Sequence, residues 1–165
     1  MARRFLLVVT AFAALALPAH VVAEGVNATV LSIGDGDTIR MLQAGKSLTI
    51  RLACIDAPEN AQTPYGQQAR QYLQQRLPIG TEVNLKVKTT DHYGRTVAEV
   101  ISDFNINLAL VENGQAFAYH QHLSNCNAQK YLDSEYQASQ ARLGVWQVPG
   151  GITRPWKFRF TSRYR

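Results

Sequence analysis

The sequence predicts an α+β domain in which five strands close into a small barrel and helices are added outside it. Five segments show the alternation of apolar and polar residues that is typical of half-buried strands. A helical pattern follows the third of these segments, and further helical patterns follow the fifth. Small closed barrels, the OB type among them, fit this order of elements.

The first three strands are expected to form a meander. Residues 27–33 and 38–42 are joined by Gly34–Asp37, a turn of residues that tolerate unusual backbone angles. A second turn at residues 44–46 leads into residues 47–55, in which every second side chain is apolar. Short connections of this kind favour antiparallel neighbours in one sheet.

The later elements follow from the same two periodicities. Residues 64–77 have apolar side chains at helical spacing, and Pro78 ends the pattern. The elements expected after it are two strands, a short helix, a short extended piece and a longer helix, at residues 82–89, 95–101, 107–113, 115–119 and 127–142.

The first 23 residues are predicted to be a signal peptide. Met1–Arg4 is a basic start, Phe5–Leu17 is an apolar run too short to span a bilayer, and Pro18 interrupts it. Val21 and Ala23 place small residues where a signal peptidase requires them, and the alternative is a retained anchor. We expect a secreted protein, periplasmic or extracellular, with no membrane contact after cleavage.

The mature chain is expected to be a monomer with one domain, residues 24–150, and a basic, aromatic tail, residues 151–165. The whole sequence carries a net charge of +5, but five of its basic residues and no acid lie in that tail. Arg3 and Arg4 lie in the predicted signal peptide, so the body of the domain has a net charge of 5 − 2 − 5 = −2 and is slightly acidic. Nucleic acid would have to be attracted by local groups in a site, helped by the tail, because the surface is not basic throughout.

Two cysteines, Cys54 and Cys126, are the whole cysteine content. A cysteine pair in an oxidising compartment favours a disulfide. Two buried, unpaired thiols are the alternative.

Acidic residues gather in two segments, each at the end of a predicted strand. Asp35 and Asp37 lie in the first turn, and Asp56 and Glu59 follow the third strand. In a meander these two strand ends lie at the same end of the sheet, where carboxylates could bind a hard cation. Taken singly, each segment is better explained as an ordinary turn or loop.

Two arginines stand in strands near these acids. Arg51 lies in the third strand, and Arg95 begins the fifth directly after the turn 91–94. A guanidinium group binds phosphate oxygens in a two-pronged way and keeps its charge at any working pH. Each arginine alone could also be a solvated strand residue paired with a nearby acid. His120 and His122 have no third metal ligand in the sequence and are expected to be ordinary loop residues.

Three segments together resemble the signature segments of the staphylococcal nuclease (thermonuclease) family. They are Gly34–Thr38, Ile50–Glu59 and Asp91–Arg95, in the family's order and spacing. The resemblance extends over about residues 26–160. It implies an OB-fold barrel with three helices and metal-dependent cleavage of single- and double-stranded DNA and of RNA.

The resemblance also implies roles for individual residues. Asp37 and Asp56 would bind calcium, and Ala57 would add its main-chain carbonyl where the best-known member has threonine. Arg51 and Arg95 would hold the scissile phosphate, and Glu59 would be the general base. Further members of the site would be Tyr93 and Tyr119, as walls of the nucleotide pocket, and Asp35, in support of the ligands.

The same resemblance places Cys54 near the start of the last helix, which favours the Cys54–Cys126 disulfide although the family archetype has no cysteine. Two other functions remain open from the sequence. One is a module that binds single strands without cutting them, and the other is a structural domain stabilised by its metal. The tail could extend the nucleic-acid surface, cover the barrel or stay loose.

Overall fold

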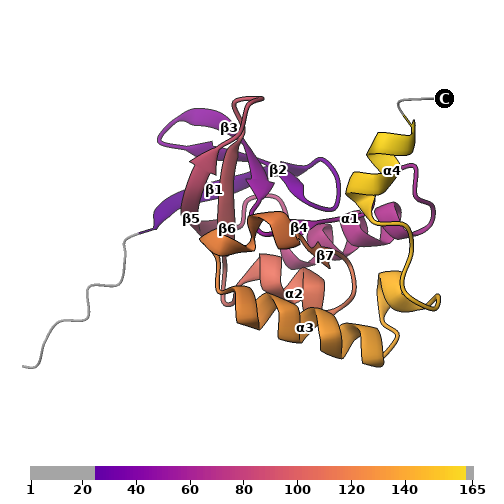
Figure 1. Cartoon of the computed structure of the whole chain (residues 1–165). Coiled ribbons are helices and arrows are strands. Elements are labelled where there is room, and N and C mark those ends of the chain that lie inside the picture. The colour runs from indigo at the N-terminus through magenta and orange to yellow at the C-terminus, as the bar shows by residue number, and fades with distance from the viewer. Residues whose placement is uncertain (1–24, 163–165) are drawn as a thin grey trace, which may run out of the picture.

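The computed structural model of the protein describes residues 25–162 (Figure 1). The predicted signal peptide and the last three residues lie outside this range. Within residues 25–162, every helix is too short or too polar to cross a lipid bilayer.

A closed barrel of five strands forms the centre of the fold, as the sequence predicts (Figure 1). The order around the barrel is β1-β2-β3-β6-β5, in which β3 and β6 are parallel and the other pairs are antiparallel. The strands are β1 Val26–Ile33, β2 Thr38–Gln43, β3 Lys46–Leu52, β5 Glu82–Thr90 and β6 Thr96–Ile101.

The barrel interior is filled by the apolar side chains that alternate along these strands. Val30, Ile39, Met41 and Ile50 are completely buried. Removing a side chain of this size from water stabilises the fold by about 1.5–3 kcal/mol. The alternation of apolar residues in the sequence therefore predicts correctly which side chains of these strands point into the barrel.

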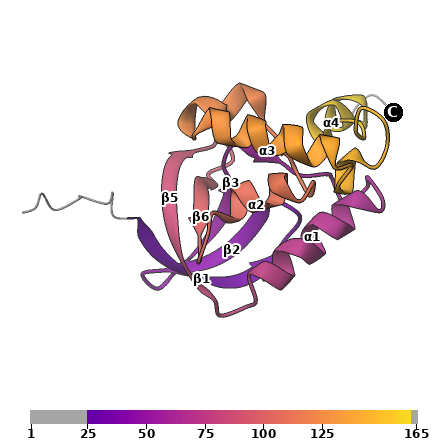
Figure 2. The ribbon, with the colours of Figure 1, turned by 90° about the horizontal axis from the view of Figure 1, so that it is seen from below.

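Three helices cover one side of the barrel, as expected. They are α1 Tyr65–Arg76, α2 Ile106–Glu112 and α3 Ala128–Gln140. Figure 2 shows α2 between α1 and α3, and α2 packs against both of them and against β6. Two short 3-10 helices, η1 His120–Asn125 and η2 Gly144–Trp146, flank α3 in the chain.

The third strand is shorter than the sequence predicts. It ends at Leu52 because Cys54 adopts a positive φ of 66°, which breaks the extended backbone. The chain continues as β4, Ile55–Asp56, which leaves the barrel and pairs with β7, Phe117–Ala118. The alternation predicted up to residue 55 is therefore wrong beyond Leu52, and the residues from Ala53 to Ala57 are all buried.

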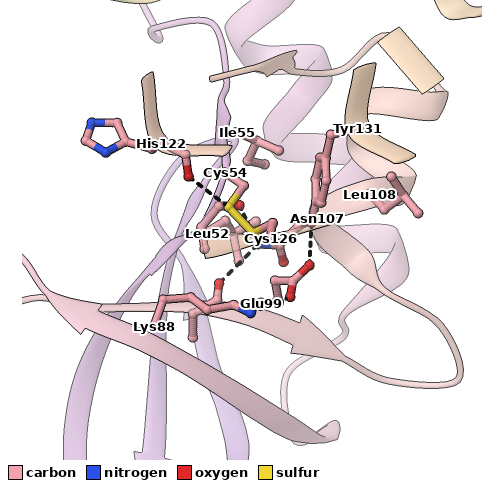
Figure 3. Close-up of a disulfide and its surroundings, with 12 residues drawn as sticks. Leu52, Cys54, Ile55, Lys88, Glu99, Asn107, Leu108, His122, Cys126 and Tyr131 are labelled. Carbon is pink, nitrogen blue, oxygen red and sulfur yellow. Dashed lines mark hydrogen bonds and ion pairs between the residues drawn. A yellow bond between two sulfur atoms is a disulfide. The ribbon is translucent and has the colours of Figure 1, made fainter. Parts of the chain in front are cut away.

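A disulfide joins Cys54 to Cys126, as predicted, with the two Cα atoms 6.4 Å apart. It connects the turn after β3 to the segment between η1 and α3 (Figure 3). Close to it, the buried carboxylate of Glu99 accepts hydrogen bonds from Tyr131 Oη at 2.8 Å and Asn105 Nδ2 at 2.7 Å. Glu99 also pairs with Lys88 at 2.9 Å, so its buried charge is compensated.

The tail forms a fourth helix, α4 Pro155–Ser162, beyond the three that were expected. The sequence left open whether the tail extends the nucleic-acid surface, covers the barrel or stays loose. For residues 155–162 the last alternative is wrong. Figures 1 and 2 show α4 near the loop that precedes α1, where Gln62 Nε2 donates to the Thr153 carbonyl at 2.7 Å.

Candidate active site

The two acidic segments meet at one end of the barrel, on either side of Arg51. Nη2 of Arg51 lies 2.6 Å from Asp56 Oδ1 and 3.1 Å from Asp37 Oδ2. One guanidinium group therefore bridges two carboxylates that are far apart in the sequence.

Strand pairing explains how Asp37 reaches this point. In the β2–β3 ladder, Thr38 lies opposite Arg51, so Asp37 is the next residue beyond the paired region. The amide of Leu52 donates to the Asp37 carbonyl at 2.8 Å and holds the two chains together there. The antiparallel register predicted from the short turns is what makes this contact possible.

The turn after β3 places Asp56 beside Arg51. Nη1 of Arg51 donates to the carbonyls of Leu52 at 2.9 Å and Ile55 at 3.1 Å, so the arginine also holds this turn. Asp56 is fully buried, and the amide of Ala57 donates to Asp37 Oδ2 at 2.8 Å. The backbone of Ala57 thus lies directly beside the Asp37 carboxylate.

Asp37 has an unusual acidity. Burial raises its pKa to about 7; Arg51 opposes this, while the nearby carboxylates of Asp35 and Asp56 add to it. Asp35 is held in place by the Asp37 amide, which donates to Asp35 Oδ1 at 3.0 Å. A buried carboxylate with a high pKa among other acids is the kind of group that a cation would stabilise in its charged form.

Arg95 reaches the same end of the barrel because β3 and β6 are parallel, with Arg51 opposite Val97. Its Nε donates to Asp91 Oδ2 at 2.7 Å, and its guanidinium lies 5.5 Å from the centre of the Tyr93 ring. The structure thus places Arg95 on the cleft, paired with Asp91 rather than with Asp37 and Asp56.

A cleft of about 590 Å³ opens at this end of the barrel. That volume lies within the range of pockets that bind small ligands. Its walls include Asp37, Arg51, Tyr93, Arg95, Tyr119 and Arg159. Both predicted tyrosines therefore face the same cleft as both predicted arginines.

Glu59 is linked to Asp56 by Arg159, a residue for which the sequence predicted no role in the site. Arg159 of α4 donates from Nη1 to Glu59 Oε1 at 2.6 Å, and from Nη2 to Asp56 Oδ2 at 2.8 Å. The sequence showed Arg159 only as one basic residue in a basic tail. No local pattern could indicate its partners, which lie about a hundred residues earlier.

The donor atoms at this site suit a hard cation. Asp37 and Asp56 offer carboxylate oxygens, and calcium accepts carboxylates, main-chain carbonyls and water. In the range 25–162, however, three or more His, Cys, Asp or Glu side chains do not converge in a group ready to hold a metal. Arg51 lies between the two aspartates and provides the compensating charge.

His120 and His122 lie in a short 3-10 helix and not in a loop. They lie on η1, where His120 Nε2 is 3.0 Å from Glu135 Oε2 and His122 faces the cleft.

Comparison with known proteins decides the family. Residues 49–148, more than half of the chain, match the family of staphylococcal nuclease homologues. The chain belongs to this family. The fold of the staphylococcal nuclease homologues is consistent with the barrel and helices described above, so the resemblance found in the sequence is confirmed.

Several relatives of this staphylococcal nuclease homologue extend the match beyond residues 49–148. The micrococcal nuclease of Shigella flexneri is 38% identical over 144 residues, which cover 81% of this chain and 80% of that protein. Protein ParB of Escherichia coli is 36% identical over 146 residues, 82% of this chain and 80% of that protein. An uncharacterized endonuclease of Haemophilus influenzae is 40% identical over 119 residues, 71% of this chain and 64% of that protein.

Proposed function

We propose that this protein is a calcium-dependent nuclease that hydrolyses phosphodiester bonds of DNA and RNA. The observation that carries the proposal is the meeting of Asp37 and Asp56 on Arg51 at the mouth of a cleft. Membership of the staphylococcal nuclease homologue family supports the reaction class.

Asp37, Asp56 and the main-chain carbonyl of Ala57 would hold the calcium ion. Their oxygens are the hard ligands that calcium prefers, and the amide of Ala57 already lies against Asp37. When bound, calcium supplies positive charge that stabilises the negative charge developing on the phosphate. Asp35 supports the ligands by fixing the backbone of Asp37.

Arg51 and Arg95 bind the phosphate. Both line the cleft, and the planar fork of N–H donors on a guanidinium group matches two phosphate oxygens. Nη2 of Arg51 is engaged by Asp37 and Asp56, so it would exchange one of these contacts for a phosphate oxygen. Both groups are held by side-chain or main-chain partners before substrate arrives, which limits the reorganisation that the reaction requires.

Glu59 is the general base. A water molecule attacks the phosphorus, its proton moves to a carboxylate oxygen of Glu59, and the bond from phosphorus to the leaving oxygen breaks. The leaving oxygen takes up a proton from solvent and departs as an alcohol. Glu59 is partly exposed, so it can take up the proton and release it to solvent.

The nucleotide lies between Tyr93 and Tyr119. Both rings line the cleft, and stacking on an aromatic ring accepts any base. Tyr119 is itself stacked on Trp156 of α4, with ring centres 5.1 Å apart and planes at 14° to each other. This contact holds the Tyr119 ring in position.

We infer that the protein works outside the cytoplasm, in the periplasm or the medium. The predicted signal peptide and the Cys54–Cys126 disulfide support this location, because disulfides persist in oxidising compartments.

Incubation with single-stranded DNA, double-stranded DNA and RNA tests the proposal. The purified mature chain, residues 24–165, should cut them with calcium and stop when EDTA is added. Binding of single strands without cutting would instead identify a binding module. Neither binding nor cutting would leave only a structural domain.

A further inference from the structure

Helix α4 contacts the candidate active site at the carboxylates of Asp56 and Glu59. Arg159 reaches Asp56 with both guanidinium nitrogens, at 2.8 Å and 3.1 Å, and Glu59 with one of them, at 2.6 Å. The guanidinium therefore lies between the proposed calcium ligand and the proposed base. This is also the region in which the attacking water has to be placed.

These contacts occupy most of the acceptor capacity of Asp56. Oδ1 already accepts from Arg51 and from Nη1 of Arg159, and Oδ2 accepts from Nη2 of Arg159. A carboxylate has about four lone-pair sites, so little capacity remains for a metal ion. A positive charge at this distance also repels any second cation.

Arg159 is able to leave this position when another cation takes its place beside Asp56. Its side chain is 37% exposed, whereas that of Asp56 is fully buried. The partly exposed guanidinium regains water when it moves away, and a bound calcium ion would compensate the buried Asp56 charge in its place. Asp56 would keep its pairing with Arg51 after such a movement.

The helix that carries Arg159 is anchored independently of this contact. Trp156 stacks on Tyr119, and the guanidinium of Arg154 lies 4.1 Å from the centre of the Phe117 ring. Pro155 is buried, and Gln62 binds the carbonyl of Thr153. Replacing Arg159 should therefore leave α4 in place.

We propose that Arg159 is a further residue of this site, an internal cation that competes with calcium for the oxygens of Asp56 and Glu59. The inference rests on the proposed function, because it assumes that these carboxylates bind calcium and activate water. In this arrangement the Arg159 side chain is a latch on a fixed helix α4, closed at low calcium and released as calcium rises. The latch raises the calcium concentration at which the site fills.

Calcium binding without nucleic acid is the direct test. Isothermal titration calorimetry on the metal-free mature chain compares the wild type with Arg159→Gln. The matched control is Lys157→Gln, which removes one positive charge from an exposed position on the same helix. We expect the dissociation constant of Arg159→Gln to fall by about two- to tenfold, and that of Lys157→Gln to stay within error.

Equal or weaker calcium binding by Arg159→Gln would overturn the latch. Circular dichroism shows whether the variant is folded. If it is not, Arg159→Lys replaces it, and its dissociation constant for calcium should lie below that of the wild type, because one ammonium group cannot make the contacts of both guanidinium nitrogens. Binding by Arg159→Lys no tighter than that of the wild type would then overturn the latch.

The nuclease assay on the wild type separates the two proposals. A wild type that neither binds calcium nor cuts nucleic acid contradicts the proposed function. A wild type that does both, beside an Arg159→Gln variant of unchanged affinity, contradicts the latch alone.

Discussion

Arg51 and Asp56 are joined by a 2.6 Å ion pair inside a turn that the same arginine holds by its other nitrogen. Asp56 has no exposed surface, so its charge depends on guanidinium partners. One side chain thus fixes the position of a proposed metal ligand and compensates its charge, and each role needs a different N–H group.

Arg51→Lys should be far more damaging than an ordinary exchange of basic residues. Lysine has a single nitrogen and cannot reach two turn carbonyls and two carboxylates together. We expect kcat/KM for single-stranded DNA to fall by about a hundredfold or more, since one preorganised donor typically contributes that much. Arg40→Lys, on the exposed face of β2, is the control and should stay within about twofold. Similar losses in both variants would contradict the role of Arg51.

Glu59→Gln should remove turnover and keep the fold. The amide keeps the size of the side chain and an oxygen for Arg159, but it cannot accept a proton at neutral pH. We expect kcat to fall by about two to four powers of ten, with the melting temperature close to that of the wild type. Glu112→Gln, at an exposed position of α2, is the control. Turnover within a few fold of wild type would remove Glu59 from the mechanism.

Asp37→Asn should stabilise the metal-free protein, and more so at alkaline pH. The ordinary carboxyl pKa is 3.8, and the folded value is about 7. Between these values the folded state holds a proton that the unfolded state has released, so stability falls as pH rises through this window and the loss is complete above the folded pKa. Asparagine cannot ionise and avoids this loss.

We expect the free energy of unfolding of Asp37→Asn to exceed that of the wild type by about 1–3 kcal/mol at pH 8, and the difference to shrink by pH 4.5. Urea unfolding with EDTA at both pH values measures this. Asp103→Asn, at an exposed position, should show no such pH-dependent gain. A destabilised Asp37→Asn at pH 8 would show that the Arg51 pair outweighs the burial of the carboxylate.

Removal of the disulfide should destabilise the domain without changing its chemistry. Cys54 and Cys126 are separated by 72 residues, and closing a loop of that length restricts the unfolded chain. We expect a Cys54→Ala, Cys126→Ala variant to lose about 2–4 kcal/mol in urea unfolding. Wild type treated with dithiothreitol is the matched comparison and should lose a similar amount. Unchanged stability in both would contradict a stabilising role of the bond.

Local sequence determined most of the barrel. The alternating strands, the two short turns and the helix ending before Pro78 could be predicted because each depends on residues within a few positions of one another. The signature segments indicated Asp37, Arg51 and Arg95, and the antiparallel register of β2 and β3 then placed Asp37 beside Arg51. These parts need only the period of a strand and the length of a turn.

Tertiary structure alone decided where β3 ends and what α4 does. Alternation continued past Leu52 in the sequence, but the positive φ of Cys54 turns the chain out of the barrel, and long-range pairing with β7 and the disulfide hold it there. Likewise, Arg159 had no local signal, because its partners Asp56 and Glu59 are reached only when the tail docks on the finished barrel. A side chain's neighbours in sequence specify its backbone, but an ion pair across a hundred residues depends on packing.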